Sequence, residues 1–180
     1  MATSSDPHLG AIRLAWWRER LEELDGGAVP AEPRLQAVAT ELLPRGINGE
    51  ELSQLEDAWL PLLEPFPWSE RQTNSLCFRG QLLFGIGARL LGQPSEEARE
   101  AGAFWSLVDA AEHCSDDVSR VMLRQWAAVV LGELQQPLPK RLRVLTVLAA
   151  LSAADLTRQA GGLKRLSAAV RHRLWGTIPQ

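Results

Sequence analysis

Apolar residues recur along the chain at spacings of three and four, the repeat that places side chains on one face of an α-helix. The pattern predicts eight helical segments, bounded by proline, glycine or a capping side chain: residues 6–25, 33–43, 48–63, 69–91, 95–114, 116–134, 141–159 and 163–175. No segment shows sustained alternation of apolar and polar residues. We therefore predict an all-α protein, a single antiparallel bundle of seven or eight helices with no sheet.

The length of 180 residues suits one domain with a substantial core. We expect that domain to span residues 1–180, with residues 1–6 flexible. The run 141–159 is apolar on most of its circumference, so we expect it at the centre of the bundle.

Charge and cysteine content narrow the possible functions. The formal net charge is −3, which argues against non-specific nucleic-acid binding. The basic residues are scattered, although the last third of the sequence is richer in them. We interpret those as solvated helix faces, with a lipid or nucleic-acid patch as the alternative: Lys140, Arg141, Arg143, Lys164, Arg165, Arg171 and Arg173. Cys77 and Cys114 form no CxxC motif and are expected to be buried thiols. With no transmembrane-length apolar run and no signal-peptide pattern, we predict a cytoplasmic protein.

Polar residues with metal-binding chemistry gather in the stretch 95–117. On one continuous helix Asp109, Glu112, His113 and Asp116 share a face, and Asp117 lies one turn beyond His113. Carboxylates at this spacing can bind a divalent cation such as Mg²⁺, joined by the histidine. The alternative is a solvated helix edge with an N-cap at position 115 or 116 for the next helix.

Three glycines, Gly80, Gly85 and Gly87, lie inside the predicted helix 69–91, where each costs about 1 kcal/mol relative to alanine. Something must approach the backbone there, either a neighbouring helix or a ligand. The seven tryptophans, including Trp105, are spread over the helices and are interpreted chiefly as packing residues, with an aromatic ligand cage as the alternative. His8 and His172 are expected to be isolated and exposed.

Several segments together resemble the squalene/phytoene synthase family. They are IRLAWWRERLEEL, PAEPRLQAVATELLPRGI, LEDAWLPLLE, RGQLLFGIGARLLG and AGAFWSLVDAAEH, in that order. The resemblance is closest to divergent bacterial members and implies an isoprenoid synthase fold. Active members join two prenyl diphosphates with Mg²⁺ held by two aspartate motifs.

The resemblance also implies where a site would lie. The second aspartate motif falls on this chain with Asp117 as its retained aspartate, His113 in place of the other, and Asp109 at the position of an asparagine. We therefore expect Asp109, His113 and Asp117 as metal ligands, and Gly80, Gly85, Trp105 and Asp109 around the prenyl ligand. We expect the helix that carries the first motif to be missing, and the chain to be an N-terminally abbreviated member with eroded aspartate motifs.

Three hypotheses follow from the resemblance. The first is a non-catalytic or altered relative that binds a prenyl-type ligand or a partner in an apolar groove between segments 69–91, 95–114 and 141–159. The second is an active Mg²⁺-dependent transferase that joins prenyl diphosphates. The third is an assembly or interaction factor that uses only the helical scaffold. We also expect Leu9, Ile12 and Trp16 of the first helix to bury a homodimer or partner surface.

Overall fold

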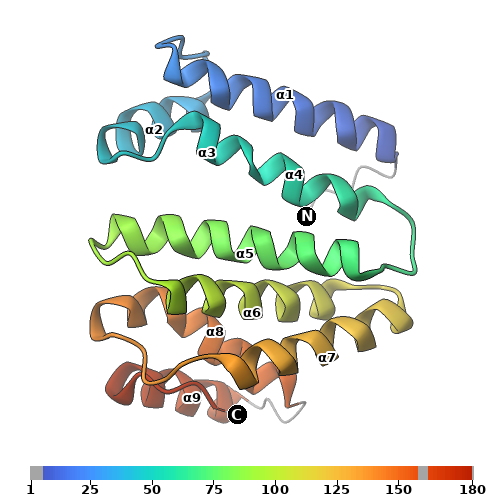
Figure 1. Ribbon diagram of the computed structural model, residues 1–180, viewed down its shortest axis with the longest axis vertical. Helices are drawn as coiled ribbons and strands as arrows, with labels where there is room; N and C mark the ends of the chain where they lie inside the picture. The colour runs from blue at the N-terminus through green and yellow to red at the C-terminus, as the bar shows by residue number, and fades with distance from the viewer. Residues whose placement is uncertain (1–5, 158–161, 180) are drawn as a thin grey trace. The chain divides into compact units, whose positions relative to one another are not determined.

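A computed structural model describes residues 6–157 and 162–179, and within these ranges the protein is all-helical with no strand (Figure 1). This confirms the predicted all-α bundle. The described helices are α1 (Pro7–Asp25), α2 (Pro33–Glu41), α3 (Gly49–Ser53), α4 (Leu55–Trp59), α5 (Glu70–Leu90), α6 (Glu96–His113), α7 (Asp117–Glu133), α8 (Arg143–Leu156) and α9 (Gly162–Trp175), with short 3-10 turns η1 (Leu43–Arg45), η2 (Leu60–Leu63) and η3 (Lys140–Leu142).

Side-chain caps set the starts of several helices, as the sequence predicts. The Asp6 carboxylate accepts a hydrogen bond from the His8 amide at the start of α1. Ser69 and Gln72 form a reciprocal capping box at the start of α5. Ser95 caps α6 through a 3.1 Å bond from the Ala98 amide.

The predicted segment 48–63 is divided in the structure. It forms α3, α4 and η2, with Pro61 inside η2. Proline lacks an amide donor, so a 3-10 turn replaces the expected last turns of the helix. If α3 and α4 are counted together, the described residues hold eight helices, as predicted. Two expectations lie largely outside the described residues. The flexibility of residues 1–6 concerns positions 1–5, and the continuation of a helix to residue 159 concerns positions 158 and 159.

The chain divides into two compact units, residues 1–65 and 66–180. In the first unit α1 packs on α3 and α4. The Asp25 carboxylate at the end of α1 accepts bonds of 2.7 and 2.8 Å from the Gly49 and Glu50 amides, so it caps α3 from another helix. That the two units pack as one domain stays a prediction.

The outer face of α1 carries exposed apolar side chains. Gly10 and Leu24 are the buried positions of this helix, whereas Leu9, Ile12 and Trp16 are all exposed. Of the four apolar residues Leu9, Ile12, Trp16 and Leu24, only Leu24 belongs to the core. That Leu9, Ile12 and Trp16 bury a homodimer or partner surface stays a prediction.

In the second unit α5 packs along α6, α6 also contacts α7 and α8, and α9 packs on α8 (Figure 1). The largest fully buried side chains of α6 are Phe104, Leu107 and Val108. The unit is therefore built around α6, the helix that contains most of the polar stretch identified in the sequence.

The segment after α9 returns to the connection between α7 and α8. The Leu138 amide donates to the Gly176 carbonyl at 2.8 Å, and the Ile178 amide donates to Oε1 of Gln136 at 2.6 Å. Gly176 has φ +75°, a conformation that glycine adopts without strain. The Arg143 guanidinium donates to the Leu174 carbonyl at 2.7 Å. These contacts join the end of the chain to a segment about forty residues earlier.

His172 is fully buried, so its expected exposure is wrong. Its Nε2 lies 2.8 Å from the Thr146 hydroxyl of α8, and its Nδ1 lies 3.2 Å from the Thr177 carbonyl. A neutral ring satisfies both when Nδ1–H donates to the carbonyl and Nε2 accepts from the hydroxyl. Burial is the main cause that lowers the pKa of His172, and the nearby Arg143 charge lowers it further.

Candidate functional site

The polar stretch is broken by a turn between α6 and α7. Helix α6 ends at His113, and Cys114 and Asp116 both have extended backbone angles. Oδ2 of Asp116 accepts bonds from the Ser119 amide and hydroxyl at 2.8 and 2.7 Å. Asp116 is therefore the N-cap of α7, the alternative that the sequence left open, and not a member of a face on α6.

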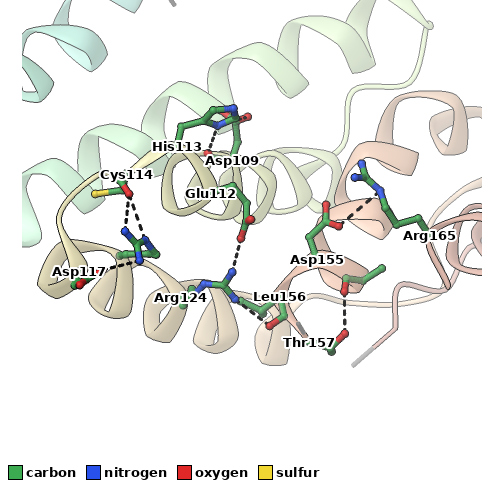
Figure 2. A network of polar contacts seen from close by, with 12 residues as sticks. Asp109, Glu112, His113, Cys114, Asp117, Arg124, Asp155, Leu156, Thr157 and Arg165 are labelled. Atoms are coloured by element: carbon green, nitrogen blue, oxygen red, sulfur yellow. Dashed lines mark hydrogen bonds and ion pairs between the residues drawn. The ribbon is translucent and has the colours of Figure 1, made fainter. Parts of the chain in front are cut away.

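Asp109 and His113 remain on one helical turn of α6. Nδ1 of His113 lies 2.7 Å from the Asp109 backbone carbonyl and 3.6 Å from its carboxylate. The His113 side chain is 72% exposed. Its ring nitrogen thus contacts its own helix, and Figure 2 shows the two residues close together.

Asp117 is placed on the next helix and is paired with Arg120. The Arg120 guanidinium donates to Asp117 at 2.6 Å and, through Nε and Nη2, to the Cys114 carbonyl at 3.2 and 3.0 Å (Figure 2). Arg120 therefore stabilises the turn, because its side chain donates hydrogen bonds both to the carbonyl of the α6 C-cap and to the first carboxylate of α7.

A second arginine links three helices. Arg124 of α7 pairs with Glu112 of α6 and donates to the Leu156 carbonyl at the end of α8 at 3.1 Å (Figure 2). Farther along, Arg165 of α9 lies 3.6 Å from the Asp155 carboxylate. Glu112 is thus half of an ion pair that joins α6 to α7.

These placements do not assemble the expected metal site. Among the described residues, no three His, Cys, Asp or Glu side chains come together as a group that could hold a metal ion. The spacing of Asp109, His113 and Asp117 implies one face only on a continuous helix. The turn after His113 changes the direction of the chain, so Asp117 leaves that face.

The glycines of α5 are approached by neighbouring helices. A Cβ on Gly80 would lie 2.8 Å from the Ala103 nitrogen of α6 and closer still to the Gly102 carbonyl. The positions next to Gly85 and Gly87 hold the side chains of Arg99 and Leu145. Helix packing, one of the two alternatives, therefore accounts for the glycines. Part of the space expected for a groove holds the core cluster Ala88, Ala98 and Leu142 with Leu145.

A buried arginine connects the remaining site residues. The Arg79 side chain of α5 is 4% exposed; its Nε donates to the Ser106 hydroxyl at 3.1 Å and its Nη2 lies 3.5 Å from the Asp109 carboxylate. The Trp105 ring lies under the guanidinium, 5.9 Å from centroid to Cζ, and stacks on Phe84. Trp105 and Asp109 are thus brought together, while Gly80 is covered by α6.

Sequence reasoning missed Arg79. It lies three positions from each of the buried residues Leu76 and Leu82, which places it on the core face of α5. A charged residue at such a position could have indicated a buried polar contact. Burial is the main cause that lowers the pKa of the Arg79 guanidinium, and the Asp109 charge acts in the opposite direction. An arginine remains charged even so, and its charge is compensated inside the unit.

No protein-family model, curated protein or solved structure matches this chain. The resemblance to the squalene/phytoene synthase family stays a prediction that rests on the sequence segments. Within the described ranges, no helix combines the length and apolar character needed to cross a membrane.

Proposed function

We propose that the chain is a squalene/phytoene synthase-like protein that acts by binding and not by catalysis. The observation that carries this proposal is the dispersal of the acidic groups at the motif position. Asp116 caps α7, Asp117 pairs with Arg120, and Asp109 faces Arg79. Ionisation of a prenyl diphosphate requires clustered Mg²⁺ ligands to neutralise the leaving group, and these carboxylates are directed to separate partners.

The surface that we assign to binding is the outer face of α1, and the occupant is a second copy of the chain. Leu9, Ile12 and Trp16 follow one another at helical spacing and are exposed by 54, 55 and 40%. Charges of both signs flank them on this helix, so pairing of two α1 helices brings no large excess of one charge together. Burial of such a stripe supplies the driving force for association.

Catalysis is tested by incubating the protein with Mg²⁺ and farnesyl or geranylgeranyl diphosphate. We expect no diphosphate release and no head-to-head product. Turnover that is lost in Asp117→Ala and retained in Glu133→Ala, a control on the same helix, would overturn the proposal in favour of an active transferase. Thermal stabilisation by a prenyl diphosphate without turnover would support the prenyl ligand as a second occupant.

Self-association is tested by size-exclusion chromatography with light scattering. We expect the native chain to form a dimer and the double variant Ile12→Ser/Trp16→Ser to be monomeric. Val29→Ser, at an exposed position outside the helices of the same unit, is the matched control and should leave the dimer intact. A native chain that stays monomeric at every concentration would reject α1 as a self-association surface.

A further inference from the structure

Helix α9 has two apolar faces. Ala168 and His172 form the buried face, and α8 is the helix that α9 packs on most closely. A second set of apolar residues, at spacings of three, four and four, faces solvent: Leu163, Leu166, Val170 and Leu174. At 100° per residue this second set lies on the side of the helix opposite to Ala168 and His172. Ordinary amphipathic helices carry polar residues there.

The exposure of this outer face is large. Leu163 is 84% exposed, and Leu166 is 60% exposed. Figure 1 shows α9 beside α8 at the end of the second unit. Aliphatic side chains that point away from a core gain nothing from folding, so their repeated occurrence on one face indicates a contact outside the unit.

Charge identifies the kind of surface that this face contacts. Between Gly162 and Trp175 the helix carries four basic residues and no acidic one: Lys164, Arg165, Arg171 and Arg173. The whole segment 140–180 holds eight basic residues and one acidic residue, a net charge of +7 in a chain whose total is −3. Such separation of charge predicts an anionic contact.

The same charges argue against a second copy as the occupant. Two α9 helices paired through their outer faces would bring Arg171 and Arg173 of each helix close to those of the other, and this repulsion opposes association. An anionic bilayer satisfies both features, because acyl chains receive the leucines and lipid headgroups receive Arg171 and Arg173, which flank the outer face at 100° per residue.

We propose that the outer face of α9 binds an anionic membrane surface, with the helix lying in the plane of the interface. This mode fits a helix of 14 residues, which is too short to cross a bilayer. The proposal concerns a surface other than α1 and holds whether or not the chain is catalytic.

Co-sedimentation with vesicles tests this proposal on the full chain. One vesicle set contains phosphatidylcholine alone, and the other contains phosphatidylcholine with about one third phosphatidylglycerol. We expect binding to the anionic set, weakened by added salt, and little binding to the neutral set. Each basic residue near an anionic surface contributes about 1 kcal/mol, so Arg171→Gln/Arg173→Gln should weaken binding by about 25-fold.

A second variant and a control isolate the apolar contribution. Leu163→Ser/Leu166→Ser should weaken binding by about tenfold or more, whereas Val121→Ser, at an exposed position on α7, should leave it unchanged. Circular dichroism checks that each variant is folded. Equal sedimentation with neutral and anionic vesicles, or equal binding by all variants, would overturn the proposal. So would binding to polyglutamate without binding to vesicles, which would indicate an acidic protein partner.

Discussion

Gly80 of α5 and Gly102 of α6 face each other so closely that neither position has room for a methyl group. A Cβ on Gly102 would lie 2.7 Å from the Phe84 Cβ and closer still to the Gly80 carbonyl oxygen. The two helices cross here with backbone against backbone, and this contact sets the distance between them.

Alanine at either glycine should therefore destabilise the protein. We expect Gly80→Ala or Gly102→Ala to lower the free energy of unfolding by about 1–3 kcal/mol, because the neighbouring atoms are backbone and cannot move aside. Gly132→Ala on α7 is the control, since an added Cβ there meets no atom within 4 Å. Denaturant unfolding measures all three variants. Equal stability of Gly80→Ala and Gly132→Ala would contradict the close crossing.

Asp109 should be coupled energetically to Arg79. Asp109→Asn removes the carboxylate that lies 3.5 Å from a buried guanidinium, and we expect a loss of about 1–3 kcal/mol in the free energy of unfolding. In an Arg79→Met background the same change should cost little, because no buried charge is left uncompensated. A double-mutant cycle measures the coupling. Additive effects would show that Asp109 acts independently of Arg79.

The two neighbouring aspartates at the start of α7 should differ in importance. Asp116→Ala removes an N-cap, and we expect the melting temperature to fall by about 2–4 °C. Asp117→Ala removes only an exposed ion pair with Arg120 and should lower the melting temperature less than Asp116→Ala does. Differential scanning fluorimetry compares the variants. A larger effect at Asp117 would show that the cap is assigned to the wrong residue.

Stability should depend on pH through His172. Its pKa in the folded protein is lowered below the ordinary value of 6.5, so the unfolded chain binds the proton first as the pH falls. The stabilising contribution of neutral His172 to the free energy of unfolding is fully present above pH 6.5. It is lost as the pH falls from 6.5 through the lower pKa of the folded protein. We expect His172→Asn to be less stable at neutral pH but to lose less stability on acidification.

The comparison with the native chain isolates this group, because carboxylates titrate in both proteins. Chemical unfolding at a series of pH values measures the two slopes. His8→Asn changes an exposed histidine and serves as the control. If His172→Asn shows the same slope as the native chain, His172 is not the group responsible.

Local patterns in the sequence predicted most of the fold, because helix starts and ends depend on neighbouring residues. Ser69, Ser95 and Asn48 cap helices where the sequence places them. The cap of α3 by Asp25 could not be foreseen in the same way, since that residue lies 24 positions before Gly49 and meets it only after folding.

The candidate site was less predictable than the fold. Asp109 and Trp105 do meet, but through Arg79 of α5, which lies 30 positions before Asp109 in the chain. The expected metal ligands fail to converge because a three-residue turn separates α6 from α7. Sequence spacing describes a face only as long as the helix continues, and an N-cap at Asp116 is the sign that it does not.

The bond from the Ile178 amide to Gln136 spans 42 positions and encloses α8 and α9 in one closed loop of the chain. Closing this loop costs conformational entropy, which the chain regains when the bond to Gln136 breaks. We therefore expect α8 and α9 to open together and not one at a time. Hydrogen–deuterium exchange should reveal α8, α9 and the segment 176–178 as one cooperative unit that opens together. Deletion of residues 176–180 would then destabilise both α8 and α9, although neither helix is part of the deleted segment.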